Sequence, residues 1–205
     1  GLKAVNFLSS HFEARSVRDG MARTVVFEQG VLKSNTLDKN VTDKPGTMIR
    51  YYVDEEIFGL YDYNSEYVEQ KIKNYTYLKA GLVFKFNGKK FESKNGLLDL
   101  LNENLGEDVL YPPIHLKGHD IEIAFTHGTG YGETYFSFVN SQYTTQGGTH
   151  QAAFKDAVAK TIKEFFKKDY EPSDVRGSII AAISVSVIEP EFESQTKIKL
   201  SSKNM

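Results

Sequence analysis

Three polar residues near the C-terminus, Gln195, Thr196 and Lys197, have the chemistry of an anion-binding loop. They follow an apolar run that reads as a buried strand. A lysine ammonium is a compact point charge that suits a terminal phosphate, and a glutamine amide can donate a hydrogen bond beside it. A solvated loop near a chain end is the simpler interpretation, and the triplet alone does not decide between the two.

A glycine-rich stretch, HGTGYGE at 127–133, could indicate a phosphate-binding loop. Such a loop must lead from a strand into a helix, so that the helix N-terminus faces the phosphate. Here the glycines join two segments with the alternation of strands. We therefore expect a hairpin connection and no phosphate site.

The histidines do not form a convincing metal or catalytic pattern. His115 and His119 are four residues apart, but Pro112-Pro113 and Gly118 argue against the helix that would align them as zinc ligands. The local signatures of a Ser-His-Asp or Cys-His site are also missing. We predict no metal site in this chain.

A basic helix is predicted over 150–168, entered through the GGTH segment, residues 147–150. The glycines permit a tight entry, and the Thr149 hydroxyl is predicted to cap the helix. The polar face carries five lysines, Lys155, Lys160, Lys163, Lys167 and Lys168, against two acids, Asp156 and Glu164. A solvated face is the usual interpretation, and a weak, salt-sensitive contact with a phosphate backbone is the alternative.

The elements that must hold these residues follow from periodicity and turn chemistry. Hydrophobic spacing predicts helices at 2–8, 64–79, 95–104 and 150–168. Asp19-Gly20 and Asn87-Gly88 each predict a tight hairpin turn. Further strands are predicted at 47–53, 109–116, 119–127, 133–140 and 178–188, whereas 31–46 has the composition of a loop.

Strands and helices are mixed without regular βαβ alternation, which favours an α+β fold. The chain turns sharply after a helix and a strand that close its first part, which predicts a domain boundary at 87/88.

Composition narrows the classes of protein. The 205 residues carry a formal net charge of −2, which excludes nucleic-acid binding by bulk positive charge but leaves a local basic stripe open. The chain has no cysteine, so disulfides and thiolate metal sites are excluded. The apolar run at 179–183 is too short to span a bilayer, and the N-terminus lacks the pattern of a signal peptide. We expect a cytoplasmic protein with no membrane partner.

Four separated segments together resemble one family. They are GLKAVNFLS at the start, PGTMIRYYVD at 45–54, GGTHQAAFKDAVAKTI at 147–162 and DVRGSIIAAISVSVIEPEFESQTKIKLSS at 174–202. The pattern is similar to the ATPase region of the B subunit of bacterial type IIA topoisomerases, DNA gyrase and topoisomerase IV. The resemblance covers essentially the whole chain, although KNYTYLK at 73–79 departs from the family's pattern.

The resemblance implies a fold and a division of the chain. Residues 1–87 would be the C-terminal part of a truncated GHKL (Bergerat) ATP-binding domain. Residues 88–205 would be a transducer domain with a ribosomal protein S5 domain 2-like fold. The family's general base, magnesium ligand and adenine-reading aspartate would precede residue 1, so we expect a fragment that is inactive alone.

The resemblance also implies site residues. Lys197 would meet the γ-phosphate of ATP with Gln195 beside it, and both are the expected catalytic residues. Thr47 would hold the adenine end, and Gly1 and Leu2 would close the phosphate-wrapping lid, unless Gly1 is a tag remnant. Lys155 would line the passage for DNA. ATP and Mg²⁺ are the expected cofactors, with the magnesium ligands outside this chain.

The function implied is ATP-driven DNA strand passage, decatenation and relaxation with an A subunit as partner and a homodimer of B subunits. The short link before DVRGS and the KLSS ending favour topoisomerase IV over the supercoiling gyrase. The alternatives are a mismatch-repair MutL-type ATPase, a non-enzymatic S5-like nucleic-acid-binding module that ignores ATP, and a purely structural domain.

Overall fold

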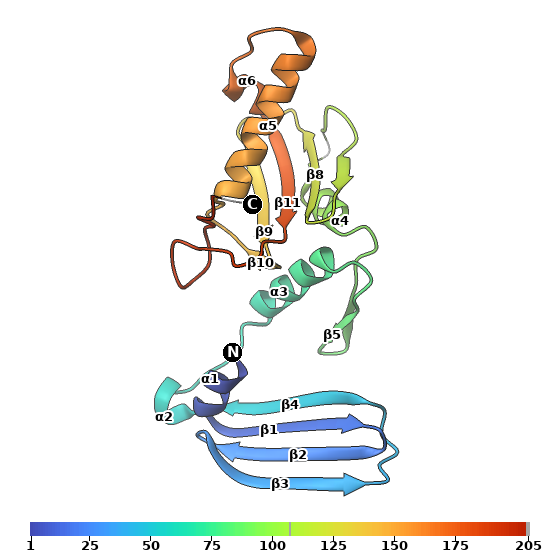
Figure 1. The fold of residues 1–205 in the computed structure, drawn as a ribbon, viewed down its shortest axis with the longest axis vertical. Coiled ribbons are helices and arrows are strands. Elements are labelled where there is room, and N and C mark those ends of the chain that lie inside the picture. Colours follow the sequence, from blue (N-terminus) through green and yellow to red (C-terminus); the bar gives the residue numbers. More distant parts are fainter. Residues whose placement is uncertain (107, 204–205) are drawn as a thin grey trace. The chain divides into compact units, whose positions relative to one another are not determined.

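The computed structural model describes residues 1–106 and 108–203 (Figure 1). It divides into two compact units, Gly1–Asn64 and the residues from Ser65 onward. Residues 65–87, which precede the predicted boundary at 87/88, therefore group with the second unit by their contacts. The assignment of 1–87 and 88–205 to two functional domains stays a prediction.

The first unit is an antiparallel sheet with two short helices. Its strand order is β3-β2-β1-β4. The elements are α1 (Leu2–Phe7), β1 (Ser9–Arg18), β2 (Met21–Glu28), β3 (Val31–Lys39), β4 (Gly46–Val53) and α2 (Glu55–Phe58). The β1–β2 turn has φ of 51° at Asp19 and 70° at Gly20, so the hairpin predicted from this pair is confirmed.

The loop predicted at 31–46 is wrong for its first nine residues, which form β3. Every residue of β3 is exposed, and the strand lies at an edge of the sheet. The composition misled the prediction because an edge strand with no buried face needs no apolar alternation. Backbone pairing with β2 holds it in place.

The second unit begins with a helix and a small hairpin and continues into a five-stranded sheet. Its elements are α3 (Ser65–Leu78), β5 (Phe84–Phe86), β6 (Lys89–Phe91), α4 (Leu97–Asn104), β7 (Ile114–Lys117), β8 (Ile121–His127), β9 (Thr134–Val139), β10 (Gln142–Tyr143), α5 (Thr149–Phe166), α6 (Pro172–Arg176) and β11 (Ile179–Val185). The sheet order is β10-β9-β11-β8-β7. Helices and strands are mixed without a βαβ repeat, so the predicted α+β class is confirmed.

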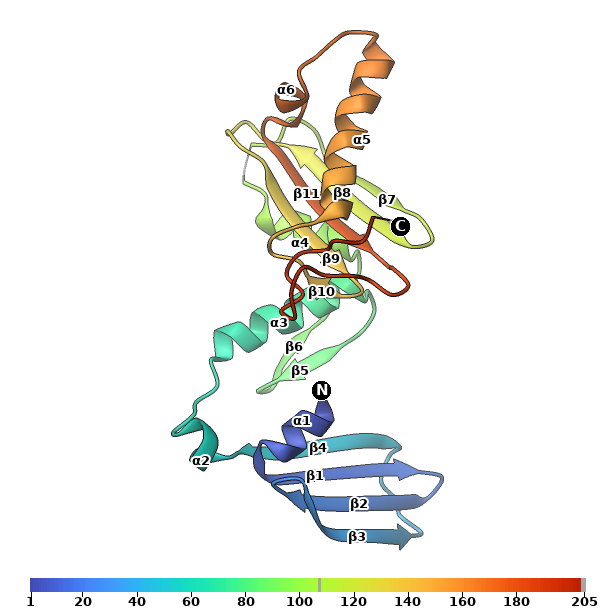
Figure 2. The same ribbon diagram turned by 60° about the vertical axis from the view of Figure 1, so that its left-hand side comes forward.

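Successive side chains of β11 point to opposite faces of the sheet, and they divide the core of the second unit into two layers. Ile179, Ala181 and Ile183 pack with Phe154 of α5 on one face. Ala182 packs with α4 on the other face, where Leu97, Leu100 and Leu101 are buried. Figure 2 shows α5 running along the sheet. β11 is therefore the central strand that both helical layers cover.

The hairpin predicted for the glycines at 128–132 is wrong, because β11 lies between the strands that they join. β11 pairs antiparallel with β8 and parallel with β9. Parallel strands need a long crossover, and the chain from β9 to β11 supplies it through α5 and α6. An apolar strand from the end of the chain thus separates two strands that are neighbours in sequence.

Candidate anion-binding hairpin and its support

The residues around the Gln-Thr-Lys triplet form a closed loop, which we call the QTK hairpin (residues 192–200). Phe192 and Leu200 form an antiparallel bridge at its base. The Glu193 amide donates to the Lys199 carbonyl over 3.1 Å, and the Lys197 amide donates to the Ser194 carbonyl over 3.0 Å. Gln195, Thr196 and Lys197 are all exposed at the tip.

The base of the QTK hairpin is seated on the GGTH segment. The Leu200 amide donates to the Gly147 carbonyl over 3.1 Å, and the Leu200 carbonyl accepts from the Thr149 amide over 3.2 Å. The Gln146 amide donates to the Ile198 carbonyl over 2.9 Å. Leu200 is only 1% exposed. Residues 147–150 and 192–200 therefore meet at the start of α5.

Gly148 makes this approach possible. Its φ is 138°, and a Cβ atom there would lie 2.4 Å from the Leu200 carbonyl oxygen. That contact is with backbone, which cannot turn aside as a flexible side chain can. The glycine is therefore required by the contact between the two segments, a more specific role than the tight helix entry predicted from sequence.

The two lysines of the hairpin differ in their surroundings. Lys199 forms an ion pair with Glu193 over 2.8 Å. Lys197 makes no ion pair with the residues that the structure describes. Its backbone has a left-handed φ of 57°, and a hydrogen bond of 2.6 Å between the Ser194 and Thr196 hydroxyls crosses the tip beside it. The hairpin thus presents one uncompensated cation to solvent, with an amide two residues away.

The prediction that Thr149 caps α5 is wrong. The helix has Gly148 at its N-cap and no side-chain cap. The Thr149 hydroxyl is buried and has no hydrogen-bond partner among the described residues. The backbone bridge to Leu200 fixes this end of the helix instead, so the hydroxyl is not needed for the cap.

His150, the last residue of GGTH, supports the site from within the core. It is buried, and its Nε2 lies 3.2 Å from the Thr144 hydroxyl. Burial lowers the pKa of His150 to about 4, so the ring is neutral at pH 7. A neutral, packed histidine at this point holds the start of α5 and does not act as a proton donor at the surface.

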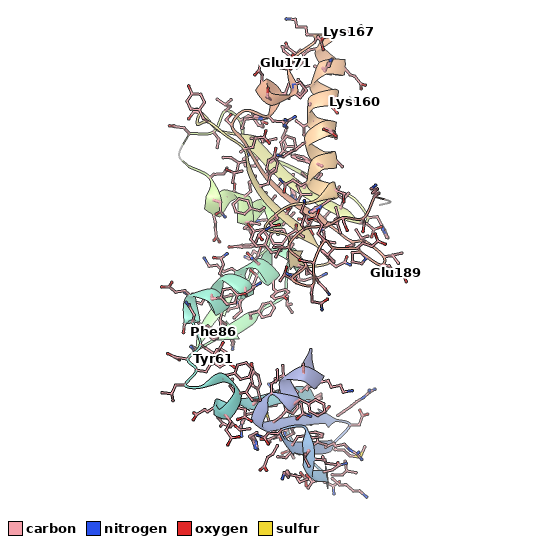
Figure 3. The ribbon with its side chains drawn as sticks, turned by 90° about the vertical axis from the view of Figure 1, so that its left-hand side faces the viewer. Tyr61, Phe86, Lys160, Lys167, Glu171 and Glu189 are labelled. Carbon is pink, nitrogen blue, oxygen red and sulfur yellow. The ribbon has the colours of Figure 1, made fainter. Side chains whose placement is uncertain are left out.

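Lys155 does not lie on a free basic face. Its Nζ is 2.9 Å from the Glu133 carboxylate and 4.4 Å from the centre of the Tyr135 ring. Lys160 lies on the side of α5 away from the sheet, and Lys167 lies at the end of the helix, as its C-cap (Figure 3). Sequence reasoning missed Glu133, because a partner 22 positions away in the connection before β9 leaves no local signal.

The predicted nucleotide residues Gly1, Leu2 and Thr47 belong to the first unit. Gly1 is the N-cap of α1, and Leu2 and Thr47 are exposed. Thr47 pairs with Ser16, whereas Ser9, which follows α1, pairs with Val53 at the other end of β4. At roughly 3.3 Å per residue, that stretch of β1 spans about 23 Å. Leu2 and Thr47 therefore lie on different elements, α1 and β4, and their joint contact with a nucleotide stays a prediction.

Among residues 1–106 and 108–203, no three acidic, histidine or cysteine side chains lie close enough to hold a metal ion. His115 and His119 instead bind the carboxylates of Glu122 and Asp120, over 3.0 and 2.7 Å. Within the same residues, no helix is both long enough and apolar enough to cross a bilayer.

Solved structures similar to this chain include nucleotide-binding domains of type II topoisomerases. The chain aligns with the 43K ATPase domain of Thermus thermophilus gyrase B, solved with an aminocoumarin, with a TM-score of 0.78 and 26% identity over 96% of this chain and 59% of that chain. It aligns with the topoisomerase IV ATP-binding domain of Francisella tularensis with a TM-score of 0.78 and 25% identity over 100% of this chain and 61% of that chain. The fold is that of the ATPase region of a type IIA topoisomerase.

The sequence profile of the family described as DNA gyrase B matches residues 59–205, and the chain belongs to that family. It is 44% identical to the B subunit of DNA topoisomerase 4 from Borreliella burgdorferi over 98% of this chain and 33% of the relative. It is 34% identical to the B subunit of DNA gyrase from Thermotoga maritima over 100% of this chain and 36% of the relative. The chain thus spans about a third of the length of these relatives. The resemblance predicted from sequence is confirmed.

Proposed function

We propose that this chain couples ATP binding and hydrolysis to DNA strand passage, as part of the B subunit of a topoisomerase IV. The observation that carries the proposal is the QTK hairpin, which presents the uncompensated cation of Lys197 on a loop tied by backbone hydrogen bonds to α5. The chain is 44% identical to a topoisomerase 4 relative and 34% identical to a gyrase relative, which favours topoisomerase IV over gyrase.

The exposed donors of the hairpin fit a triphosphate. Lys197 would contact the γ-phosphate and stabilise the charge that develops on the transferred group, and the Gln195 amide would donate beside it. Backbone amides at Gly1 and Leu2 would surround the phosphates, and Thr47 would hold the adenine end. In this proposal the Mg²⁺ ligands are residues outside this chain.

The hydrogen bonds at the base of the hairpin suggest how nucleotide state reaches the rest of the second unit. A displacement of Lys197 on phosphate binding would move Leu200. The hydrogen bonds of Leu200 to Gly147 and Thr149 would then carry that movement to the first turn of α5. The partners in this proposal are a DNA duplex, an A subunit and a second copy of the B subunit, in the cytoplasm. We expect no ATP turnover from the 205 residues alone.

The test replaces Lys197 with alanine in the intact subunit assembled with its A subunit. Loss of one transition-state donor lowers turnover about 10²-fold or more, so DNA-stimulated ATP hydrolysis and decatenation should fall together. Lys199→Ala is the matched control, because it removes a lysine of the same hairpin that is already paired with Glu193. Wild-type turnover in Lys197→Ala would overturn the assigned role. Supercoiling of relaxed circles, with weak decatenation, would assign the protein to gyrase.

A further inference from the structure

Three hydrogen-bond donors converge on the carboxylate of Glu133. The Lys155 Nζ is 2.9 Å from Oε2, and the Tyr135 hydroxyl donates to the same oxygen over 2.8 Å. The Arg176 Nε donates to Oε1 over 3.1 Å. The side chains of Glu133, Lys155 and Arg176 are 25%, 32% and 19% exposed, so the cluster is partly shielded but open to solvent on one side.

The donors come from three separate elements that the fold brings together. Tyr135 lies on β9, Lys155 on α5 and Arg176 at the end of α6. Lys155 is also fixed over the Tyr135 ring, at 4.4 Å from its centre. Lys155 and Tyr135 thus also contact each other without Glu133, whereas the side chain of Arg176 reaches the cluster through its hydrogen bond to that carboxylate.

Glu133 itself is attached differently. It stands between Gly132 and the first residue of β9, and Gly132 has a φ of 93° with open space where a Cβ would be. Burial acts to raise the pKa of Glu133, but the hydrogen bonds from Lys155, Tyr135 and Arg176 outweigh it and lower the pKa below its usual value. The carboxylate is therefore ionised, and it offsets only one of the two cations that bind it.

The arrangement matches an anion with one negative charge and two exposed oxygens. A phosphodiester has the same charge and presents two non-bridging oxygens, whereas a terminal phosphate carries more charge. Exchange of the carboxylate for a phosphodiester would keep every donor paired and leave the local charge unchanged.

We propose that Lys155, Tyr135 and Arg176 form a binding site for a backbone phosphate of duplex DNA, and that Glu133 occupies this site until DNA displaces it. The inference rests on the proposed function, since it takes the DNA duplex as the partner. It adds Arg176 and Tyr135 to Lys155 as DNA contacts, and it makes Glu133 an internal competitor that weakens DNA binding.

The test measures binding of a mixed-sequence duplex oligonucleotide to the intact subunit over a series of KCl concentrations. Glu133→Gln keeps the shape but removes the competing charge. It should bind DNA several-fold more tightly, and the plot of log K against log[KCl] should steepen by about 0.9 for each phosphate gained. Adding Arg176→Gln to Glu133→Gln should return both values toward wild type.

Glu164→Gln is the matched control, because it removes a carboxylate beside a lysine of the same helix. Glu164 pairs with Lys160 over 3.8 Å at an exposed position. An equal gain in both variants would overturn the proposal, since it would reflect net charge alone. An unchanged affinity and slope in a Glu133→Gln protein that melts at the wild-type temperature would also overturn it.

Two further measurements keep the outcome decisive. If Glu133→Gln melts well below wild type, Glu133→Asp serves instead, because its shorter side chain retains charge but reaches the donors less well. Wild-type DNA affinity of Glu133→Asp would then overturn the proposal. The second measurement is the melting temperature of Glu133→Gln with inorganic phosphate. A rise in that temperature, without tighter DNA binding, would also overturn the proposal. Loss of turnover in Lys197→Ala with no effect of Glu133→Gln would reject this inference and leave the proposed function standing.

Discussion

At the residue scale, His150 is an ionisable group that the core keeps neutral. Its Nε2 contacts the Thr144 hydroxyl, and its Nδ1 is buried with no hydrogen-bond partner among the described residues. The Ser137 hydroxyl extends the network to Thr144, 3.0 Å away, and to the Gln151 side chain, 3.1 Å away. Protonation of the ring would place a charge in this closed set of neutral groups, which burial disfavours.

The consequence is a pH-dependent stability. An unfolded histidine has a pKa of about 6.5, and the folded pKa of His150 is about 4. Between these values the unfolded state binds the proton and the folded state does not, so stability falls as pH drops through this window and is unaffected above it. We expect His150 to contribute a loss of about 2–3 kcal/mol by pH 4. Urea unfolding of wild type and His150→Gln at pH 7 and pH 4.5 checks this, and an identical loss in both proteins would contradict it.

Sequence allowed some of these residues to be identified and not others. The exposure of Gln195, Thr196 and Lys197 follows from their polarity next to an apolar strand, and it was predicted. The pairing of Glu133 with Lys155 and Arg176 depends on three elements meeting in space. No local sequence pattern encodes such a contact between distant segments. The interpretation of the lysines as a solvated face is therefore wrong at Lys155, which pairs with Glu133.

At the element scale, the QTK hairpin depends on one backbone contact with the start of α5. An alanine at Gly148 would have to adopt a φ near 138° and would bring its Cβ within 2.4 Å of the Leu200 carbonyl oxygen. Relief of that overlap must separate the hairpin from α5. Strain of this kind costs on the order of 1–3 kcal/mol, in addition to any hydrogen bonds lost.

We therefore expect Gly148→Ala to lower the melting temperature by several degrees and to reduce ATP turnover in the intact subunit. Gly130→Ala is the matched control, because a Cβ at Gly130 would have no atoms within 4 Å and the residue has no left-handed φ. Thermal unfolding and DNA-stimulated ATPase assays of the two variants provide the measurement. A Gly148→Ala protein with wild-type turnover would show that the seating of the hairpin is not required for catalysis.

The sequence predicted helices, strands and turns correctly where residues close together in the chain determine them. The turns at Asp19-Gly20 and Asn87-Gly88 have the left-handed φ values that their residue types favour. It failed at β3, which has no buried face to impose alternation. It also failed at the β8–β9 connection, because the insertion of β11 between the two strands is decided by long-range pairing.

At the scale of the whole molecule, the chain consists of two compact units that are joined at residues 64 and 65. The segment 59–64 between α2 and α3 has no helix or strand, and Leu60 is 96% exposed. Exposed segments without regular structure are preferred sites of proteolysis. This segment is where the units should separate when the chain is cut.

Limited digestion with chymotrypsin should first cleave after Leu60 or Tyr61. The larger product, which starts near Ser65, contains both core clusters of the second unit, so it should keep a cooperative thermal transition. Mass spectrometry of the products and calorimetry of the larger one provide the measurement. Early cleavage near 87/88, the boundary predicted from sequence, would indicate instead that α3 and the β5–β6 hairpin are only loosely held by the second unit.

The central place of β11 in the sheet has a consequence for biosynthesis. During translation, β8 and β9 leave the ribosome before the strand that must join them. At about 5–20 residues per second, the intervening residues 140–178 take roughly 2–8 s to make. For that time the nascent chain carries two unpaired strand edges, which are templates for association with other chains. These edges are exposed only while the chain is being made. A chaperone that covers them during synthesis should therefore raise the yield of soluble protein more than salt that is added later, during purification.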